Sequence, residues 1–171
     1  MNTTLRSTVR RLREAAALFD DQEAPEFAPP ASPAELRALA AATRVAPSDD
    51  FIQLLSLHRA IIAMEVHNGY WLGGSASGRV ALAEGPGSAT FGGARLTAFP
   101  VASDGGGNLF LRPRTMSSIW RWNHETGVTH RVAKSFVEFL GLVAEDWEHA
   151  ARGDQTRLYL VSSARYRQRD R

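Results

Sequence analysis

The chain has 171 residues, a length typical of one domain that buries about two thirds of its unfolded surface. Hydrophobic residues make up 44% of it and charged residues 22%, and no apolar run approaches the roughly 20 residues that a membrane-spanning helix needs. The absence of cysteine excludes disulfide bonds and, with a start that lacks an apolar signal core, predicts a cytoplasmic protein. The formal charge is +2 with Lys134 as the sole lysine, which favours genomic base composition over a nucleic-acid site as the origin of the many arginines.

Residues 1–31 read as a helix followed by an acidic linker. One helical face carries regularly spaced apolar residues: Leu5, Val9, Leu12 and Ala16. This pattern is typical of a helix packed on a domain, and the stripe is short for a helix that binds a membrane. Residues 20–33 combine prolines with acidic side chains and predict an extended connector. Its acidic residues either pair with the basic first helix or contact a basic partner: Asp20, Asp21, Glu23 and Glu26.

Two helices are expected next. Ser32-Pro33-Ala34-Glu35 is a capping box with proline at the first helical position. Pro47-Ser48-Asp49-Asp50 begins a second helix, with acidic side chains at its positive end. The apolar residues from 51 to 66 fit a helical stripe, and we therefore favour helix through residue 66. The alternative is a strand over residues 60–66, with Asn68-Gly69 as the turn of a hairpin.

The aromatic pair Tyr70-Trp71 precedes a glycine-rich segment that predicts a flexible loop over residues 73–78. Exposed beside such a loop, the pair would be a candidate partner contact, because Trp and Tyr are frequent anchors in protein interfaces. Packing into the core is an equal alternative. Downstream we expect a strand over residues 79–83, a second glycine-rich loop over residues 84–93 and a strand over residues 95–102.

The most informative stretch runs from Phe99 to Leu140. Three glycines within residues 103–108 predict a chain reversal, because glycine adopts positive φ without a Cβ clash. In the strand-like run that follows, Trp120 and Trp122 share one face and Arg121 points to the other. A turn at residues 123–127 and a short strand over residues 128–132 come next. A capping box at residues 135–138 then starts a helix with one apolar face: Phe136, Phe139, Leu140, Val143 and Trp147.

Three motifs in this stretch resemble the C-terminal half of the SMI1/KNR4 family, also called the SUKH superfamily. They are Phe99-Pro100-Val101-Ala102 leading into Asp104-Gly105-Gly106-Gly107-Asn108, then Trp120-Arg121-Trp122-Asn123-His124-Glu125, and the helix start Ser135-Phe136-x-Glu138-Phe139-Leu140. Their order and spacing are more specific than any one of them alone. The chain then divides into an N-terminal helix and linker (1–31), a domain similar to this family (32–152) and a C-terminal extension with an arginine-rich tail (153–171).

The resemblance implies an α+β fold with N-terminal helices, a twisted mostly antiparallel sheet and a C-terminal helix packed on the sheet. Many bacterial members are immunity proteins that bind and neutralise a cognate toxin, often a nuclease, and fungal members act through protein contacts. We therefore expect a non-catalytic protein-binding module. The alternative is a housekeeping adaptor or ligand-binding protein of the same fold without a toxin partner. A basic nuclease would favour an acidic face, and acidic residues are densest here at 20–26 and 145–148.

No residue pattern predicts a catalytic, cofactor or metal site. The glycine runs match neither phosphate-binding motif, and the five histidines form no recognisable ligand cluster. Ser103, Asp104 and His124 supply the residue types of a hydrolytic triad, but no G-x-S-x-G elbow accompanies them. Residues 157–161 predict an edge strand or a packed tail. The alternating arginines after residue 164 suggest a third hypothesis, nucleic-acid binding, for which the affinity would fall steeply with salt concentration.

Overall fold

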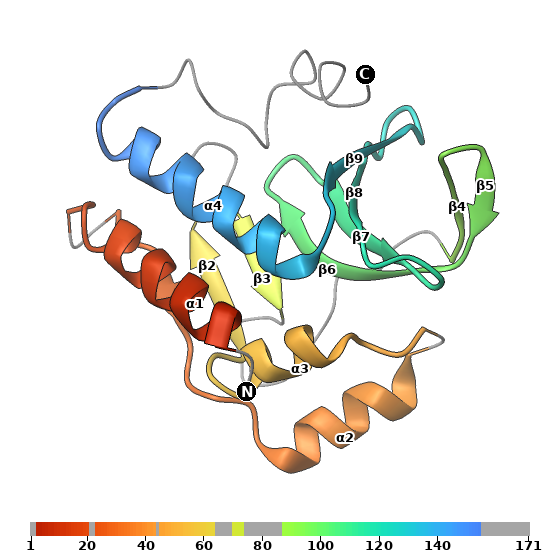
Figure 1. Ribbon diagram of the computed structural model, residues 1–171, viewed down its shortest axis with the longest axis horizontal. Helices are drawn as coiled ribbons and strands as arrows, with labels where there is room; N and C mark the ends of the chain where they lie inside the picture. Colours follow the sequence, from red (N-terminus) through yellow and green to blue (C-terminus); the bar gives the residue numbers. More distant parts are fainter. Residues whose placement is uncertain (1–2, 21–22, 44, 64–69, 74–86, 155–171) are drawn as a thin grey trace.

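The computed structural model describes residues 3–20, 23–43, 45–63, 70–73 and 87–154 (Figure 1). This part of the chain folds into helices and antiparallel strands, which confirms the α+β expectation. The helices are α1 (Thr3–Ala16), α2 (Pro33–Ala42), α3 (Asp49–Leu55) and α4 (Phe136–Ala150). The strands are β1 (Glu26–Phe27), β2 (Ala60–Ala63), β3 (Tyr70–Gly73), β4 (Ala89–Phe91), β5 (Ala94–Leu96), β6 (Ala98–Asp104), β7 (Leu109–Pro113), β8 (Ile119–Trp122) and β9 (Thr129–Ala133).

Seven of these strands form one sheet in the order β1-β2-β3-β6-β7-β8-β9, with antiparallel pairing throughout. Helices α1 and α4 lie side by side, and α4 packs on the sheet (Figure 1). Buried aromatic side chains dominate the main core, among them Phe51, Phe99, Phe110, Phe139 and Trp147. Each fully buried side chain of this size stabilises the fold by about 1.5–3 kcal/mol relative to an exposed one.

Helix α1 forms where the apolar stripe predicts it and buries that stripe against the domain. Leu5 and Leu12 are fully buried, and Val9 is nearly so. On the flank of the stripe, Arg11 Nε and Nη2 donate to the two carboxylate oxygens of Glu148 in α4 at 2.8 and 2.9 Å. A 14-residue helix is marginal in water by itself, so packing on α4 is what holds α1 in place.

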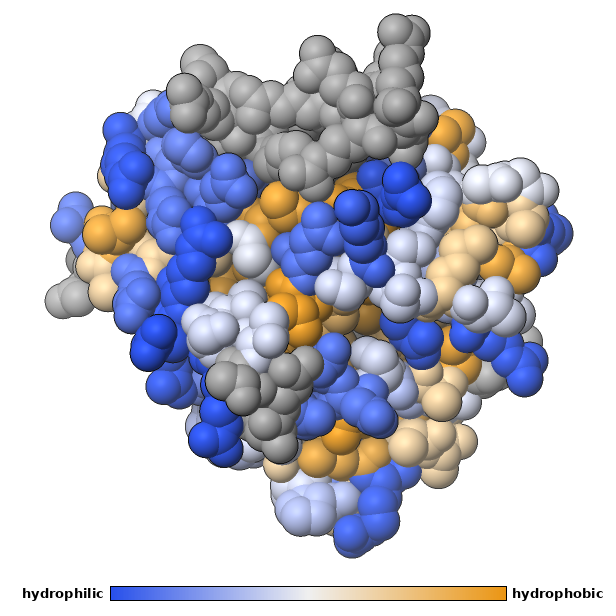
Figure 2. Space-filling view, viewed as in Figure 1, coloured by the Kyte–Doolittle hydropathy of each residue, from blue (hydrophilic) through white to orange (hydrophobic). Residues whose placement is uncertain are grey.

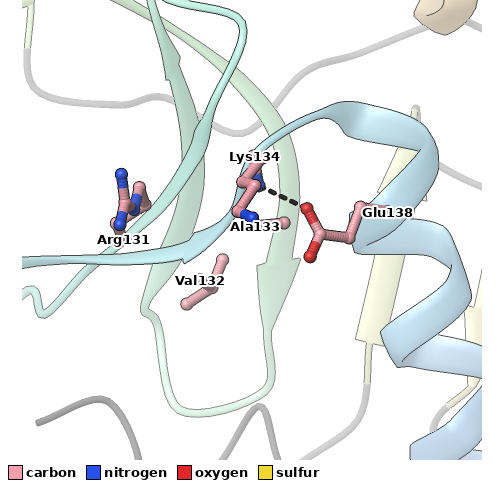
Figure 3. A pocket seen from close by; sticks show the side chains of 5 residues that line it. All are labelled: Arg131, Val132, Ala133, Lys134 and Glu138. Carbon is pink, nitrogen blue, oxygen red and sulfur yellow. Dashed lines mark hydrogen bonds between the residues drawn. The ribbon is translucent and has the colours of Figure 1, made fainter. Parts of the chain in front are cut away.

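Helix α4 also begins where the sequence predicts. The Ser135 Oγ accepts from the Glu138 backbone N–H at 3.1 Å. The Glu138 carboxylate reaches back and accepts from the Lys134 backbone N–H at 2.7 Å, one residue before the cap (Figure 3). The predicted apolar face is buried along the whole helix, because its spacing matches the helical period and the sheet covers it.

The prediction of helix through residue 66 is wrong. Helix α3 ends at Leu55, and Ala60–Ala63 form strand β2 between β1 and β3. All four residues of β2 are buried, so their sequence is continuously apolar and does not alternate. A short run of this kind looks the same whether it is a doubly buried strand or part of a buried helix. The open alternative, a strand in this region, is the correct one for these four residues.

The linker over residues 20–33 is not only a connector, because Glu26 and Phe27 form the edge strand β1. The Phe27 ring packs edge-on against the rings of His58 and Trp147, at centroid distances of 5.1 and 6.3 Å. His58 is buried, and its Nδ1 lies 3.1 Å from the Ala28 carbonyl oxygen. The chain therefore returns to the sheet after α1 before it enters α2.

The glycine-rich segment over residues 84–93 contains strand β4, and the predicted strand over residues 95–102 is divided between β5 and β6. Gly92 and Gly93 both adopt positive φ, at 54° and 87°, and join β4 to β5. Two consecutive residues of this kind form the tight turns preferred in hairpins, which explains why a glycine run here marks a hairpin and not a long loop. The hairpin packs Phe91 over β7 and β8 in a second, smaller core.

Several expectations lie outside the described residues. These are the loop over residues 74–78, the strand over residues 79–83, the Asn68-Gly69 turn, Asp21, the side chains of Tyr70 and Trp71, and the C-terminal extension after residue 154.

Candidate protein-binding surfaces

The aromatic pair Tyr70-Trp71 lies in a strand. Strand β3 runs between β2 and β6, and its register places Tyr70 beside Ala63 and Asp104, and Trp71 beside Ile62 and Ser103. The backbone of the pair is therefore inside the sheet. A partner contact through these two side chains stays a prediction.

The acidic residues of the linker lie at the surface. Asp20, Glu23 and Glu26 are exposed. The ring contact between Phe27 and Trp147 places this segment beside the buried face of α4, and Glu145 is exposed on the same helix. The ends of α1 and α4 lie together at the left of Figure 1, and Figure 2 shows mainly hydrophilic residues over α1. We call Asp20, Glu23, Glu26 and Glu145 the acidic end.

One carboxylate near the acidic end is already engaged. The ion pair with Arg11 lowers the pKa of Glu148, chiefly through the hydrogen bond, and the same bond raises the pKa of Arg11. Both side chains are partly exposed, so solvent screens this pair and it contributes modestly to stability. Its structural effect is to fix the end of α4 against α1. The sequence left pairing between the basic first helix and the linker as one of two alternatives, and Arg11 pairs instead with a carboxylate in α4.

The glycine turn between β6 and β7 is held by a buried carboxylate. Asp104 is 7% exposed, and its Oδ1 accepts from the backbone N–H groups of Gly106 and Asn108 at 3.0 and 2.9 Å. The Asn108 Nδ2 lies 3.1 and 3.0 Å from the two carboxylate oxygens. Oδ2 also accepts from Arg121 Nη2, in β8, at 3.2 Å. Asp104 therefore connects the glycine turn and strand β6, to which it belongs, with strand β8.

The same network continues to the next turn. Asn108 Oδ1 accepts from the His124 backbone N–H at 3.3 Å, and the His124 Nδ1 lies 3.4 Å from it. Gly107 has φ of 80°, and a Cβ at this position would lie 3.4 Å from the His124 ring. Of the three glycines in this turn, this is the one whose positive φ favours glycine, while the His124 ring would make an ordinary contact with a Cβ there. The side chains of Asn108 and His124 thus fix the two turns relative to each other.

The triad considered from sequence does not assemble. The Asp104 carboxylate is surrounded by Gly106, Asn108 and Arg121, and the imidazole of His124 contacts Asn108 instead. Within the described ranges, no group of three or more His, Cys, Asp or Glu side chains is placed to hold a metal ion. Three charged residues of the motifs, Asp104, Arg121 and Glu138, make the turn and cap contacts described above.

Two open cavities border β9, the last strand of the sheet, and the sequence did not indicate either. One, of about 320 Å³, is lined by Arg131, Lys134 and Glu138 (Figure 3). The other, of about 620 Å³, lies between the β4–β5 turn and the β8–β9 turn and is lined by Trp120. The Trp120 Nε1 donates to Ser118 Oγ at 2.9 Å, which fixes the ring against Phe91. The first cavity depends on how α4 begins beside β9, and the second on how the β4–β5 hairpin packs over the sheet. Both therefore arise from tertiary packing that a local sequence pattern does not reveal.

No helix among the described residues is both long enough and apolar enough to cross a bilayer. No protein-family model matches the chain, and no curated protein or solved structure matches it significantly. The geometry described above is therefore the basis for a functional proposal.

Proposed function

We propose that this chain is a protein-binding module of the SMI1/KNR4 type, and that it acts as a bacterial immunity protein that neutralises a cognate toxin by binding it. It performs no chemistry of its own. It recognises a protein surface and covers the toxin's active site.

One observation carries the proposal: the separate motifs that resemble the family contact one another in the fold. Asp104, from the first motif, pairs with Arg121 of the second, and Asn108 of the first contacts His124 of the second. The third motif caps the helix that buries Phe139 against Phe110, with ring centroids 4.9 Å apart. Motifs that serve a common scaffold leave recognition to the remaining surface, as expected of a family whose partners vary.

The charge distribution supports a basic partner. Residues 155–171 hold five of the 20 basic residues and one of the 18 acidic ones, so residues 1–154 hold 15 basic and 17 acidic side chains and carry a formal charge of −2. The basic character of the whole chain therefore comes from its last 17 residues. We place the toxin contact at the acidic end, where Asp20, Glu23, Glu26 and Glu145 are exposed, because complementary charge accelerates and orients encounter.

The alternative is an adaptor of the same fold that has no toxin partner. The buried scaffold network and the acidic end are compatible with this alternative too. A stable complex with a resident cellular protein, together with the absence of a toxin gene beside this gene, would favour the adaptor.

Gene deletion tests the proposal. Loss of this gene should arrest growth when a neighbouring toxin gene is intact, and deletion of both genes should restore growth. A matched strain carries this gene with Glu23→Lys and Glu26→Lys, which reverse charge at exposed positions without touching the core. Healthy growth after loss of this gene alone, with the toxin expressed, would refute the immunity function.

A further inference from the structure

A cavity of about 310 Å³ lies where β7 ends, away from the acidic end. Arg112, at the end of β7, and Arg114, in the turn that follows, line it together with Thr115 and Ser117. Its other side is formed by the residues that begin α3 and α4. This volume is at the small end of the range for ligand-binding pockets, so a small ion or one chemical group fits better than a drug-sized molecule.

Arg112 differs from the other arginines that are withdrawn from solvent. In the described part of the chain three arginines are at least partly buried: Arg59, Arg112 and Arg121. Arg59 pairs with Glu35 at 3.5 Å, and Arg121 pairs with Asp104 at 3.2 Å. Arg112 has no carboxylate within 4 Å among the described residues, although burying a guanidinium without an opposite charge is costly.

The contacts that Arg112 does make are incomplete. Its Nη2 donates to the Ala46 carbonyl oxygen. Its Nε is buried and has no hydrogen-bond partner within the described residues. Burial lowers the pKa of Arg112, and no neighbouring acid counters that effect. The Nε of Arg121 is likewise buried without a partner, so the missing carboxylate is what distinguishes Arg112.

The remaining groups of the cavity leave the two arginines dominant. The serine hydroxyls at the two helix starts are engaged in capping, since Ser48 Oγ accepts from Phe51 N–H and Ser135 Oγ from Glu138 N–H. Asp50 contributes one negative charge to the lining, without an ion pair to either arginine. The cavity thus has two positive charges against one negative charge.

We propose that this cavity binds a small tetrahedral oxyanion of the phosphate class, with Arg112 and Arg114 as its ligands. The planar guanidinium presents N–H donors in a fork that matches phosphate oxygens, and such charge-assisted bonds are stronger than neutral ones. Thr115 lines the same cavity and can add a hydroxyl donor, whereas the Ser117 hydroxyl donates to the Lys134 carbonyl oxygen at 3.2 Å. Inorganic phosphate and the phosphate of a small monoester share this chemistry. The site is separate from the acidic end and does not depend on the toxin proposal.

The test is titration of the full-length protein with inorganic phosphate, against sodium chloride at equal ionic strength. Binding is followed by amide NMR shifts and by the rise in the unfolding temperature that a ligand of the folded state produces. Phosphate should shift amides around residues 112–117 in a saturable way. Phenyl phosphate in a parallel titration distinguishes the sources: tighter binding assigns the site to a monoester, and equal or weaker binding assigns it to free phosphate.

Three variants make the result specific. Arg114→Gln changes an exposed side chain, so it should fold normally and weaken phosphate binding about tenfold, the loss expected for one charge-assisted contact. Arg112→Lys keeps the charge but removes the fork, and should weaken binding by a similar factor. Arg95→Gln is the matched control, because it removes an equal charge from exposed β5 outside the cavity, and it should leave binding unchanged. An equal loss in Arg95→Gln, or no phosphate effect beyond that of chloride, would overturn the site.

Discussion

Replacement of Asp104 by alanine tests the scaffold network most sharply. The change removes the acceptor for the Gly106 and Asn108 N–H groups and leaves Arg121, which is 8% exposed, without its counter-charge. Removal of one partner from a buried ion pair costs about 3–5 kcal/mol. We therefore expect Asp104→Ala to lower the free energy of unfolding by about 4 kcal/mol, a large part of the roughly 5–15 kcal/mol typical of a domain.

A double-mutant cycle separates the ion pair from general damage. Arg121→Met fills similar space without a charge, so it should destabilise the wild type but stabilise the Asp104→Ala variant. Urea unfolding followed by tryptophan fluorescence reports both, because Trp147 is fully buried and becomes exposed on unfolding. The proposed role of the Asp104–Arg121 ion pair would be refuted if Asp104→Ala lowered the free energy of unfolding by less than about 1 kcal/mol, or if Arg121→Met had the same effect in both backgrounds.

Further predictions address pH, the α1 contact and two glycines. Burial lowers the pKa of His58, so the unfolded chain takes up a proton at this residue at a higher pH than the folded chain does. The free energy of unfolding should therefore be greatest above about pH 6.5 and should fall as the pH drops towards the folded-state pKa. His58→Gln should reduce this pH dependence, measured as the urea midpoint at a series of pH values. Arg11→Gln should cost about 1 kcal/mol or less, and the cost should shrink in high salt, because the pair with Glu148 is half exposed. Gly107→Ala should destabilise by about 1–2 kcal/mol because its φ is positive, whereas Gly141→Ala, in α4 with open space around its Cβ, should stabilise by about 0.5–1 kcal/mol in thermal unfolding.

Local sequence signals predicted the elements whose causes are local. The apolar stripe of α1, the serine caps of α2 and α4 and the glycine turn after β6 each depend on residues within one or two turns of chain, and all are present. The alternation of Trp120 and Trp122 was also informative. Both rings pack in the smaller core, while Arg121 turns to the other side and meets Asp104.

The errors occur where long-range pairing decides the structure. Strand β2 is apolar on both faces because Ile61 and Ala63 pack in the main core while Ala60 and Ile62 pack in a separate cluster with Ala28, and no local period reveals this second cluster. Strand β1 is two residues long and exists only because it pairs with Ile61 and Ile62. The cavity beside Arg112 is likewise assembled from α3, β7 and α4, so a sequence pattern could not show that this arginine lacks a carboxylate.

The same limit applies to function. Asp20, Glu23 and Glu26 were predicted as contact candidates from composition, and the structure adds that they are exposed. The ring contact between Phe27 and Trp147 places their segment beside α4. Local charge density therefore indicated the segment, while packing determined which helix it lies beside.

The central claim, that this chain neutralises a toxin by binding it, is tested by measuring growth rescue and complex formation together. The proposal requires a toxin gene beside this one. That toxin is expressed with the wild-type chain or with the Glu23→Lys, Glu26→Lys variant, and complex formation is measured with the purified proteins. The wild type should restore growth and form a stable complex, and the folded variant should lose both together. A wild-type chain that is folded, yet neither binds the toxin nor restores growth, would contradict the proposed function.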